Sequence, residues 1–462
     1  MRTHKATLSR REFLSTTSAG VAAAIAASPL AGAGGVNNKT AKLACSGGQP
    51  VRTKPWPSWP VWDRTAEDDI LAVLRSGVWC RAQGTRVTEF ERRYAGLLGA
   101  RSCLATASGT TALITALHTL GVEAGDEVIV SPYTFLASYN AVFMVKALPV
   151  FADTDPETFT INPARVEERI TGRTRAILPV HILGLPVEMD PIMAAARKHG
   201  LVVVEDACQA WLAEYKNRKC GLLGDLGCFS FQNSKHLPAG EGGAVVGNDE
   251  TAVDRCHAFH NCGRPHGSFQ PPGNNPTRGV NFRMQEFQAV ILMSQMKRLE
   301  KDTRLRARNA EYLTSRLRQI PGIVPCKLNP GATRAVYHLY PFRYKKEFFN
   351  QAPRAKFLEA LAAEGIPCSG GYGPANKDGL IEEALTSRSY QRLFSKERLD
   401  RYRQDNILPL NDQLCAEAVW FTQNMLLGTP EDMDDIADAI EKIYANREKL
   451  AERGGFEPPI RL

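Results

Sequence analysis

The spacing of hydrophobic residues divides the chain into two parts. Between residues 66 and 300, short apolar runs rich in β-branched residues alternate with longer stretches of helical spacing. The runs that predict strands are 128–130, 148–151, 176–180, 201–204 and 228–231. Such alternation predicts an α/β fold in which helices cover both faces of a mainly parallel sheet.

The second part predicts a smaller α+β domain. A helix near residues 285–300 is expected to close the large domain. Helical spacing then returns at 303–319, 354–364 and 431–453, and a strand is predicted at 337–344. We therefore expect a large domain at residues 66–300, a small C-terminal domain at 301–453 and a tail at 454–462.

Residues 34–65 lack this periodicity and are rich in glycine and proline. Trp56, Trp59 and Trp62 alternate there with prolines. This pattern predicts an extended arm whose tryptophans pack against other parts of the protein.

The first 33 residues are typical of an export signal. Arg10 and Arg11 precede a weakly apolar run at 18–30, and small residues follow at 31–33. This pattern fits a cleavable twin-arginine signal, which would take the folded protein to the periplasm or cell envelope. The run is too short for a stable membrane span. The alternative is a disordered basic tail on a cytoplasmic enzyme.

Composition excludes several other classes of protein. The 462 residues are 44% hydrophobic and 23% charged, as in soluble globular proteins. The net charge of +8 is mild, and no basic block interleaved with aromatics follows the signal, so nucleic-acid binding is not expected. The 11 cysteines show no C-x-x-C pair, which fits neither a metal site nor a disulfide framework.

Two segments suggest a binding site for a phosphorylated ring. Ser108, Gly109 and Thr110 open an apolar helix, and the free N–H groups of a helix N-terminus suit a phosphate. An ordinary N-cap would have the same sequence. Asp206 follows a buried strand, at the edge where parallel sheets bind ligands. Its carboxylate could pair with a protonated ring nitrogen, or could cap the next helix.

Two further segments suggest covalent chemistry at a carbonyl. Lys235 follows the apolar run 228–231, which contains Ser230, and precedes the Gly-rich turn 240–243. Desolvation lowers the pKa of a lysine in such a place and frees its amine to attack a carbonyl, whereas a solvated surface lysine is the alternative. Phe135 ends another strand in an aromatic turn. Its ring could stack on a flat cofactor, or could simply pack in the core.

In this order, the segments closely resemble the DegT/DnrJ/EryC1/StrS family of fold-type I aminotransferases, which depend on pyridoxal phosphate (PLP). The resemblance covers about residues 47–450. Its most specific motifs are Phe229-Ser230-Phe231-x-x-x-Lys235 and Gly240-Glu241-Gly242-Gly243, with support from Glu205-Asp206-Ala207-x-Gln209 and from the segment 281–288. Within the family, the arm and residues 76–79 look closest to the branch of scyllo-inosose aminotransferases and aminohydroxybenzoate synthases.

The resemblance implies a role for each matching residue. Lys235 would form a Schiff base with PLP and later move a proton, and Asp206 would pair with the pyridine nitrogen. The other implied cofactor contacts are Ser108, Gly109, Thr110 and Ser230 at the phosphate, Phe135 on the ring, Gln209 at the 3-hydroxyl, and Asn281 and Arg283 from a neighbouring subunit. The resemblance therefore also implies a homodimer with shared active sites.

The implied reaction moves an amino group from glutamine or glutamate to a keto-sugar or cyclitol ketone. Two alternatives are a PLP-dependent dehydrating or aromatising enzyme and an exported, non-catalytic binding module with the same fold. The chain departs from the family at Ala210-Trp211-Leu212, usually Ala-His-Gly, and at His236-Leu237-Pro238, usually Asn-Leu-Thr. We expect both departures to lie near the substrate.

Overall fold

The computed structural model describes residues 41–273 and 277–452. The predicted signal, the first residues of the predicted arm and the predicted tail lie outside the described residues.

A seven-stranded sheet forms the centre of the fold, in the order β1-β9-β8-β5-β4-β2-β3. Parallel pairing joins β3, β2, β4, β5 and β8, and only β9 runs antiparallel to its neighbours. The strands are β1 (Ser102–Thr106), β2 (Glu127–Val130), β3 (Leu148–Phe151), β4 (Thr174–Leu178), β5 (Val202–Asp206), β8 (Leu226–Ser230) and β9 (Gly243–Gly247). All five predicted strands are present, and the predicted α/β class is confirmed.

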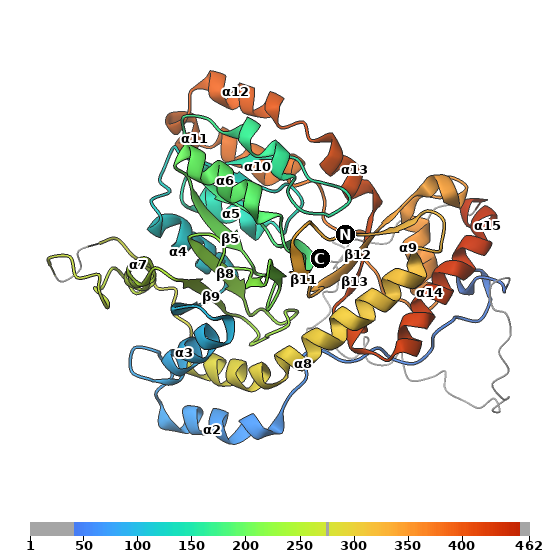
Figure 1. Cartoon of the computed structure of the whole chain (residues 1–462), viewed down its shortest axis with the longest axis horizontal. Helices are drawn as coiled ribbons and strands as arrows, with labels where there is room; N and C mark the ends of the chain where they lie inside the picture. Colours follow the sequence, from blue (N-terminus) through green and yellow to red (C-terminus); the bar gives the residue numbers. More distant parts are fainter. Residues whose placement is uncertain (1–40, 274–276, 453–462) are drawn as a thin grey trace, which may run out of the picture. The chain divides into compact units, whose positions relative to one another are not determined.

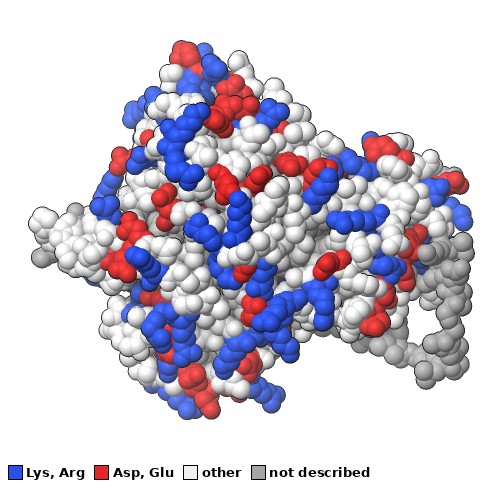
Figure 2. All heavy atoms as spheres, viewed as in Figure 1, with Lys and Arg blue, Asp and Glu red and all other residues white. Residues whose placement is uncertain are grey.

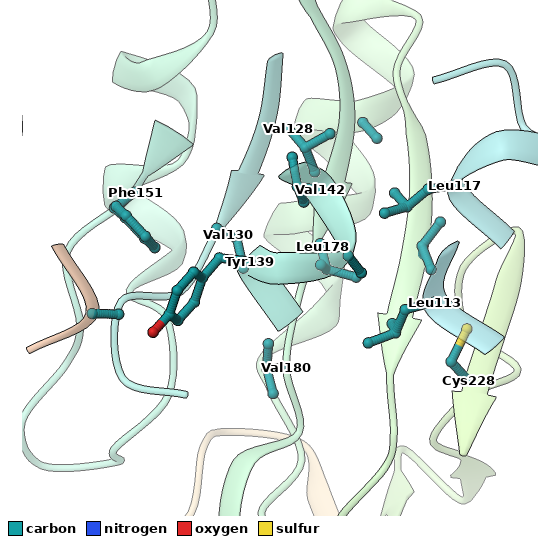
Figure 3. Close-up of a cluster of buried hydrophobic side chains, with 14 of the residues drawn as sticks. Leu113, Leu117, Val128, Val130, Tyr139, Val142, Phe151, Leu178, Val180 and Cys228 are labelled. Carbon is teal, nitrogen blue, oxygen red and sulfur yellow. The ribbon is translucent and has the colours of Figure 1, made fainter. Parts of the chain in front are cut away.

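Alternate residues of each strand enter different cores on the two faces of the sheet. Val128 and Val130 of β2 belong to one core, whereas Ile129 between them belongs to the other. Figure 3 shows part of the first core, where Leu113 and Leu117 of a covering helix lie among residues of the strands. Burial on both faces explains why these strands are continuous apolar runs in the sequence.

Helices from both halves of the chain cover the sheet (Figure 1). They are α3 (Arg86–Leu98), α4 (Gly109–Thr119), α5 (Ala137–Met144), α6 (Met189–His199), α7 (Glu250–His260), α10 (Gly379–Thr386), α11 (Arg388–Leu393), α12 (Lys396–Asp405) and α13 (Pro409–Glu417), whereas α2 (Glu67–Ser76) packs against the long helix Glu286–Leu317. Helices α10–α13 contribute Leu385, Tyr390 and Leu414 to the first core, although the sequence predicts that they belong to the small domain.

A second sheet, in the order β10-β12-β13, has its own core. Its strands are β10 (Ile323–Pro325), β12 (Leu339–Tyr344) and β13 (Ala418–Thr422). The helices α9 (Arg354–Ala363), α14 (Pro430–Ala445) and α15 (Arg447–Glu452) contribute to the same core. A third, small sheet consists of β11 (Ala332–Arg334), β6 (Glu214–Tyr215) and β7 (Arg218–Lys219). Helix α8 (Glu286–Leu317) runs from α3 to the second sheet, so the predicted domain boundary at residue 300 lies inside one continuous helix.

The described part of the arm is fixed to the rest of the protein. Arg52 pairs with Asp432 at 2.7 Å, and Lys54 pairs with the same carboxylate at 2.6 Å. Burial raises the pKa of Asp432, but hydrogen bonds from Lys54 and Arg52 outweigh burial and hold this pKa well below its ordinary value. Trp56 and Trp59 pack as predicted and donate hydrogen bonds through Nε1, whereas Trp62 is 46% exposed.

Charges of both signs are interspersed on the face shown in Figure 2, without one dominant basic surface. Within the described ranges, no helix combines the length and apolar character that a bilayer span requires.

Candidate active site

A cavity of about 850 Å³ opens at the carboxyl ends of the parallel strands. Eight of the predicted site residues line it: Ser108, Gly109, Thr110, Phe135, Asp206, Gln209, Ser230 and Lys235. Residues from four separate segments of the chain therefore meet at the edge of the sheet that general rules for parallel α/β sheets predict.

The start of α4 provides an anion site on one wall of the cavity. Ser108 caps the helix, because its side chain accepts a hydrogen bond from the Thr111 N–H at 3.1 Å. The N–H groups of the first turn have no partner within the helix and are available to a phosphate. A Cβ on Gly109 would lie 2.7 Å from the Cβ of Ser230. Only glycine therefore lets the helix start approach the end of β8 so closely.

Asp206 stands at the end of β5 with its carboxylate fixed by two donors. Ser138 Oγ donates to Oδ2 at 2.7 Å, and the Cys208 N–H donates to Oδ1 at 3.1 Å. The residue is only 5% exposed. A fixed, buried carboxylate of this kind suits a cationic partner such as a protonated pyridine nitrogen.

Gln209 is held by a residue that the sequence analysis did not identify. Its Oε1 accepts from the Leu183 N–H at 2.7 Å, and its Nε2 donates to the Tyr372 hydroxyl at 2.9 Å. Burial raises the pKa of Tyr372 to about 12, so this hydroxyl stays protonated at neutral pH. Phe135 is half exposed, and its ring lies 6.5 Å from the Tyr372 ring.

Lys235 lies in a tight turn after β8, and contacts hold both ends of the residue. Its backbone N–H donates to Gln232 O at 2.9 Å, and its carbonyl accepts from Trp59 Nε1 at 3.0 Å. Its amine Nζ lies 3.4 Å from His338 Nε2. Burial lowers the pKa of Lys235 below its ordinary value, and nearby Cys208 and Asp206 only partly offset this effect. The lowered pKa increases the share of the amine in its neutral, nucleophilic form.

The rest of the cavity is aromatic or polar and mostly uncharged. Trp59 and Trp420 supply aromatic walls, and Gln423, Asn424 and Asn233 supply side-chain amides. Within the described part of the chain, Lys235 is the only Lys or Arg among the lining residues.

Asn281 and Arg283 lie outside this cavity. Arg283 Nη1 donates to Asn261 Oδ1 at 2.9 Å, and Asn281 pairs with Asn261 through the backbone. Their role in the site of a neighbouring subunit remains a prediction.

The expectation that the two departures from the family motif lie near the substrate stays a prediction. Trp211 and His236 do not line the cavity, and both are almost fully buried, at 0% and 1% exposure. Their rings pack 5.4 Å apart beside His338, because the turns that carry them fold inward after β5 and β8. These departures from the family motif therefore change the buried side chains that pack against His338, next to Lys235.

The cavity fits PLP and defines the class of protein. A lysine with a lowered pKa, a fixed carboxylate and a helix N-terminus meet at the carboxyl edge of a mainly parallel sheet, with a glycine where a larger residue would close the anion site. These features define a fold-type I PLP-dependent enzyme.

Comparison with known proteins identifies the family. The DegT/DnrJ/EryC1/StrS aminotransferase family matches residues 61–438. The chain belongs to this family and is a PLP-dependent aminotransferase.

Individual relatives match the chain over nearly its whole length. An L-glutamine:2-deoxy-scyllo-inosose aminotransferase from Streptoalloteichus tenebrarius is 37% identical, covering 88% of this chain and 99% of the relative. The enzyme of the same name from Streptomyces kanamyceticus is 36% identical, covering 89% of this chain and 99% of the relative. The crystal structure of 3-amino-5-hydroxybenzoic acid synthase matches with a TM-score of 0.74 and 29% identity, covering 86% of this chain and all of that chain.

Proposed function

We propose that this protein transfers the amino group of L-glutamine to the ketone of a cyclitol of the scyllo-inosose type. The similarity to glutamine:scyllo-inosose aminotransferases over almost the full length supports this substrate pair. The observation that carries the proposal is the cavity lining, in which aromatic rings and uncharged amides surround one reactive lysine.

Different residues of the cavity would contact different parts of the cofactor. PLP, when bound, supplies the electron sink of the reaction. The start of α4 and Ser230 would hold its phosphate, and Asp206 would keep its ring nitrogen protonated. Gln209 would contact the ring hydroxyl, and Phe135 would cover a face of the ring. Lys235 would hold the cofactor and then, as a free amine, carry the proton taken from the carbon of the amino donor.

The remaining lining suits a neutral polyol ring. Side-chain amides such as those of Gln423 and Asn424 can both donate to and accept from hydroxyl groups. Trp59 and Trp420 offer flat faces for the C–H surface of a ring. A nucleotide diphosphate would need cationic partners, and among the described residues of a single chain Lys235 is the only Lys or Arg that lines the cavity.

The α-carboxylate of glutamine also needs a partner, and we propose that a second copy of the chain supplies it. Asn281 and Arg283 are the proposed contributors, which makes the active form a homodimer. Mixing Lys235→Ala chains with Arg283→Ala chains tests this idea. Restored activity in the mixture supports shared sites, and inactivity of a mixture shown to contain mixed dimers contradicts them.

The twin-arginine signal leads us to propose export of the folded enzyme to the periplasm or cell envelope. Fractionation of cells that carry the chain with Arg10 and Arg11 intact or replaced by lysine tests this localisation. Equal distribution of both chains would contradict export.

The proposed reaction is tested with purified protein, PLP, L-glutamine and 2-deoxy-scyllo-inosose. We expect an aminocyclitol and the 2-oxo acid of glutamine in equal amounts, and no comparable turnover of a nucleotide-linked keto-sugar. Turnover of the nucleotide-linked ketone alone would contradict the cyclitol proposal. Formation of an aromatic product would favour the aromatising alternative, which the structural likeness to 3-amino-5-hydroxybenzoic acid synthase keeps open.

A further inference from the structure

A buried group of nitrogen-bearing side chains lies behind Lys235. His338, His236 and Trp211 pack together, with ring centroids 5.4–5.9 Å apart. His338 is only 4% exposed, yet it is the member of this group that lines the cavity. Its Nε2 lies 3.4 Å from the amine of Lys235. His338 therefore connects the buried group to the reactive nitrogen.

The protonation state of His338 determines which atom donates and which accepts in its contact with Lys235. Burial, followed by the positive charges of Lys235 and Arg306, holds the pKa of His338 well below its ordinary value. A neutral imidazole has one nitrogen that accepts hydrogen bonds, whereas an ammonium group only donates. When the Lys235 amine is protonated, Nζ therefore donates and Nε2 of His338 accepts.

Lys235 has few other partners for its amine. Nearby Cys208 and Asp206 act on its charge, and His338 Nε2 lies 3.4 Å from its nitrogen. Asp206 already accepts hydrogen bonds from Ser138 and the Cys208 N–H. Hydrogen bonds fix the backbone N–H and carbonyl of Lys235, whereas a lysine side chain has several rotatable bonds that must be ordered to aim its amine.

We propose that His338 is a positioning residue, which holds the free amine of Lys235 through a hydrogen bond to Nε2 and keeps it aimed into the cavity. The contact matters in the stages of the reaction when Lys235 carries a proton and is not attached to the cofactor. This inference rests on the proposed role of Lys235. It assigns a function to a side chain that lies 103 positions further along the chain.

The test compares His338→Leu with His338→Gln in the full chain. Leucine removes the acceptor, and we expect kcat to fall by about 10–100-fold with little change in either KM, because a misplaced amine slows proton transfer. Glutamine keeps an acceptor oxygen and should recover most of this loss. His199→Leu, at a surface histidine of α6 paired with Glu167, is the matched control and should leave kcat unchanged.

A second readout does not depend on turnover. The cofactor-free full-length chain is mixed with PLP at a series of pH values, reduced with borohydride, and analysed for the adduct on the Lys235 peptide. Loss of an acceptor disfavours the ammonium form, so the pH profile of attachment should move to lower pH in His338→Leu. The glutamine variant should follow the unchanged chain.

Two results would overturn the positioning role. One is an unchanged kcat and pH profile in His338→Leu, and the other is a glutamine variant that is as impaired as the leucine variant. Neither result bears on the role of Lys235 itself, because the unchanged chain can still form the PLP adduct on Lys235 in either case. Absence of that adduct from the unchanged chain would instead overturn the proposed role of Lys235, together with this inference.

Discussion

Glu205 precedes Asp206 on β5 and points to the opposite side, where it is fully buried. Its carboxylate accepts four hydrogen bonds of 2.6–2.9 Å, from the backbone N–H groups of Gly221, Leu223 and Gly224 and from His181 Nε2. The carboxylate thus fixes the loop that follows the small sheet against the strand that carries Asp206. Glu205→Gln is a small change in shape that tests this arrangement.

The cost of the substitution follows from the four partners, which are all donors. His181 Nδ1 accepts from the Val187 N–H at 3.0 Å, so the imidazole proton is on Nε2 and points at Glu205. The amide oxygen of glutamine can satisfy two of the four donors, and its NH₂ group faces the other two. Two buried donors without an acceptor, at about 1–3 kcal/mol each, give a loss of about 2–6 kcal/mol in the free energy of unfolding.

Urea unfolding of the cofactor-free chain, followed by circular dichroism, measures this loss. Glu214→Gln is the matched control, because Glu214 is partly exposed and pairs with the partly exposed Lys219. Its cost should stay below about 1 kcal/mol. If Glu205→Gln unfolds at the same urea concentration as the unchanged chain, the carboxylate does not fix the loop and the argument from its four donors is wrong.

The other predictions concern the cofactor site and the arm. Gly109→Ala should weaken PLP binding by about 10-fold or more in a fluorescence titration, because its Cβ would meet Ser230 at 2.7 Å. Gly96→Ala, with open space around its Cβ, should bind PLP normally. The depressed pKa of Asp432 stabilises the fold above about pH 4, and this stabilisation is lost as pH falls through the folded-state pKa. The stability deficit of Asp432→Asn in unfolding experiments should therefore shrink below pH 4, and a deficit independent of pH would contradict the pairing. Lys442→Met leaves a buried carboxylate unpaired and should cost about 3–5 kcal/mol in the same experiments.

The sequence predicts the sheet well because both faces of its strands are buried. Five strands appear as continuous apolar runs. Their alternation with helices along the chain indicates that they pair in parallel. Strands β1 and β9 were both missed, and the sequence of β9, Gly243–Gly247, follows directly on a Gly-rich turn. A Cβ on Gly243 would lie 2.3 Å from Ser108 O, so its glycine serves close packing between distant segments. No local pattern reports such a contact.

The division into domains depends on tertiary packing and was harder to predict. Helix α8 keeps its helical spacing across residue 300, so nothing in the sequence marks where it passes from one core to the next. Leu385 and Leu414 have the same apolar character as residues of the small domain, and only the folded structure shows that they pack on the large sheet.

Candidate site residues were predictable where a motif surrounds them. Lys235 and Asp206 stand at the ends of apolar strands, and their position in the cavity follows from that placement. His338 immediately precedes β12 and Tyr372 lies in a distant loop, both without a recognisable motif, and nothing local shows that they face the cavity. Trp211 follows the Asp206 motif closely, yet it is buried, because sequence proximity to a site does not fix the direction of a side chain.

The most direct test of the central claim is the visible absorption spectrum of the purified protein with PLP, before and after borohydride reduction, with mass mapping of the reduced peptides. The account predicts a yellow protein whose visible band disappears on reduction and a pyridoxyl group on Lys235. It also predicts that Lys235→Ala keeps the fold by circular dichroism but lacks both the covalent group and turnover. A colourless protein that gains no band with PLP, or a pyridoxyl group on another lysine, would contradict the account.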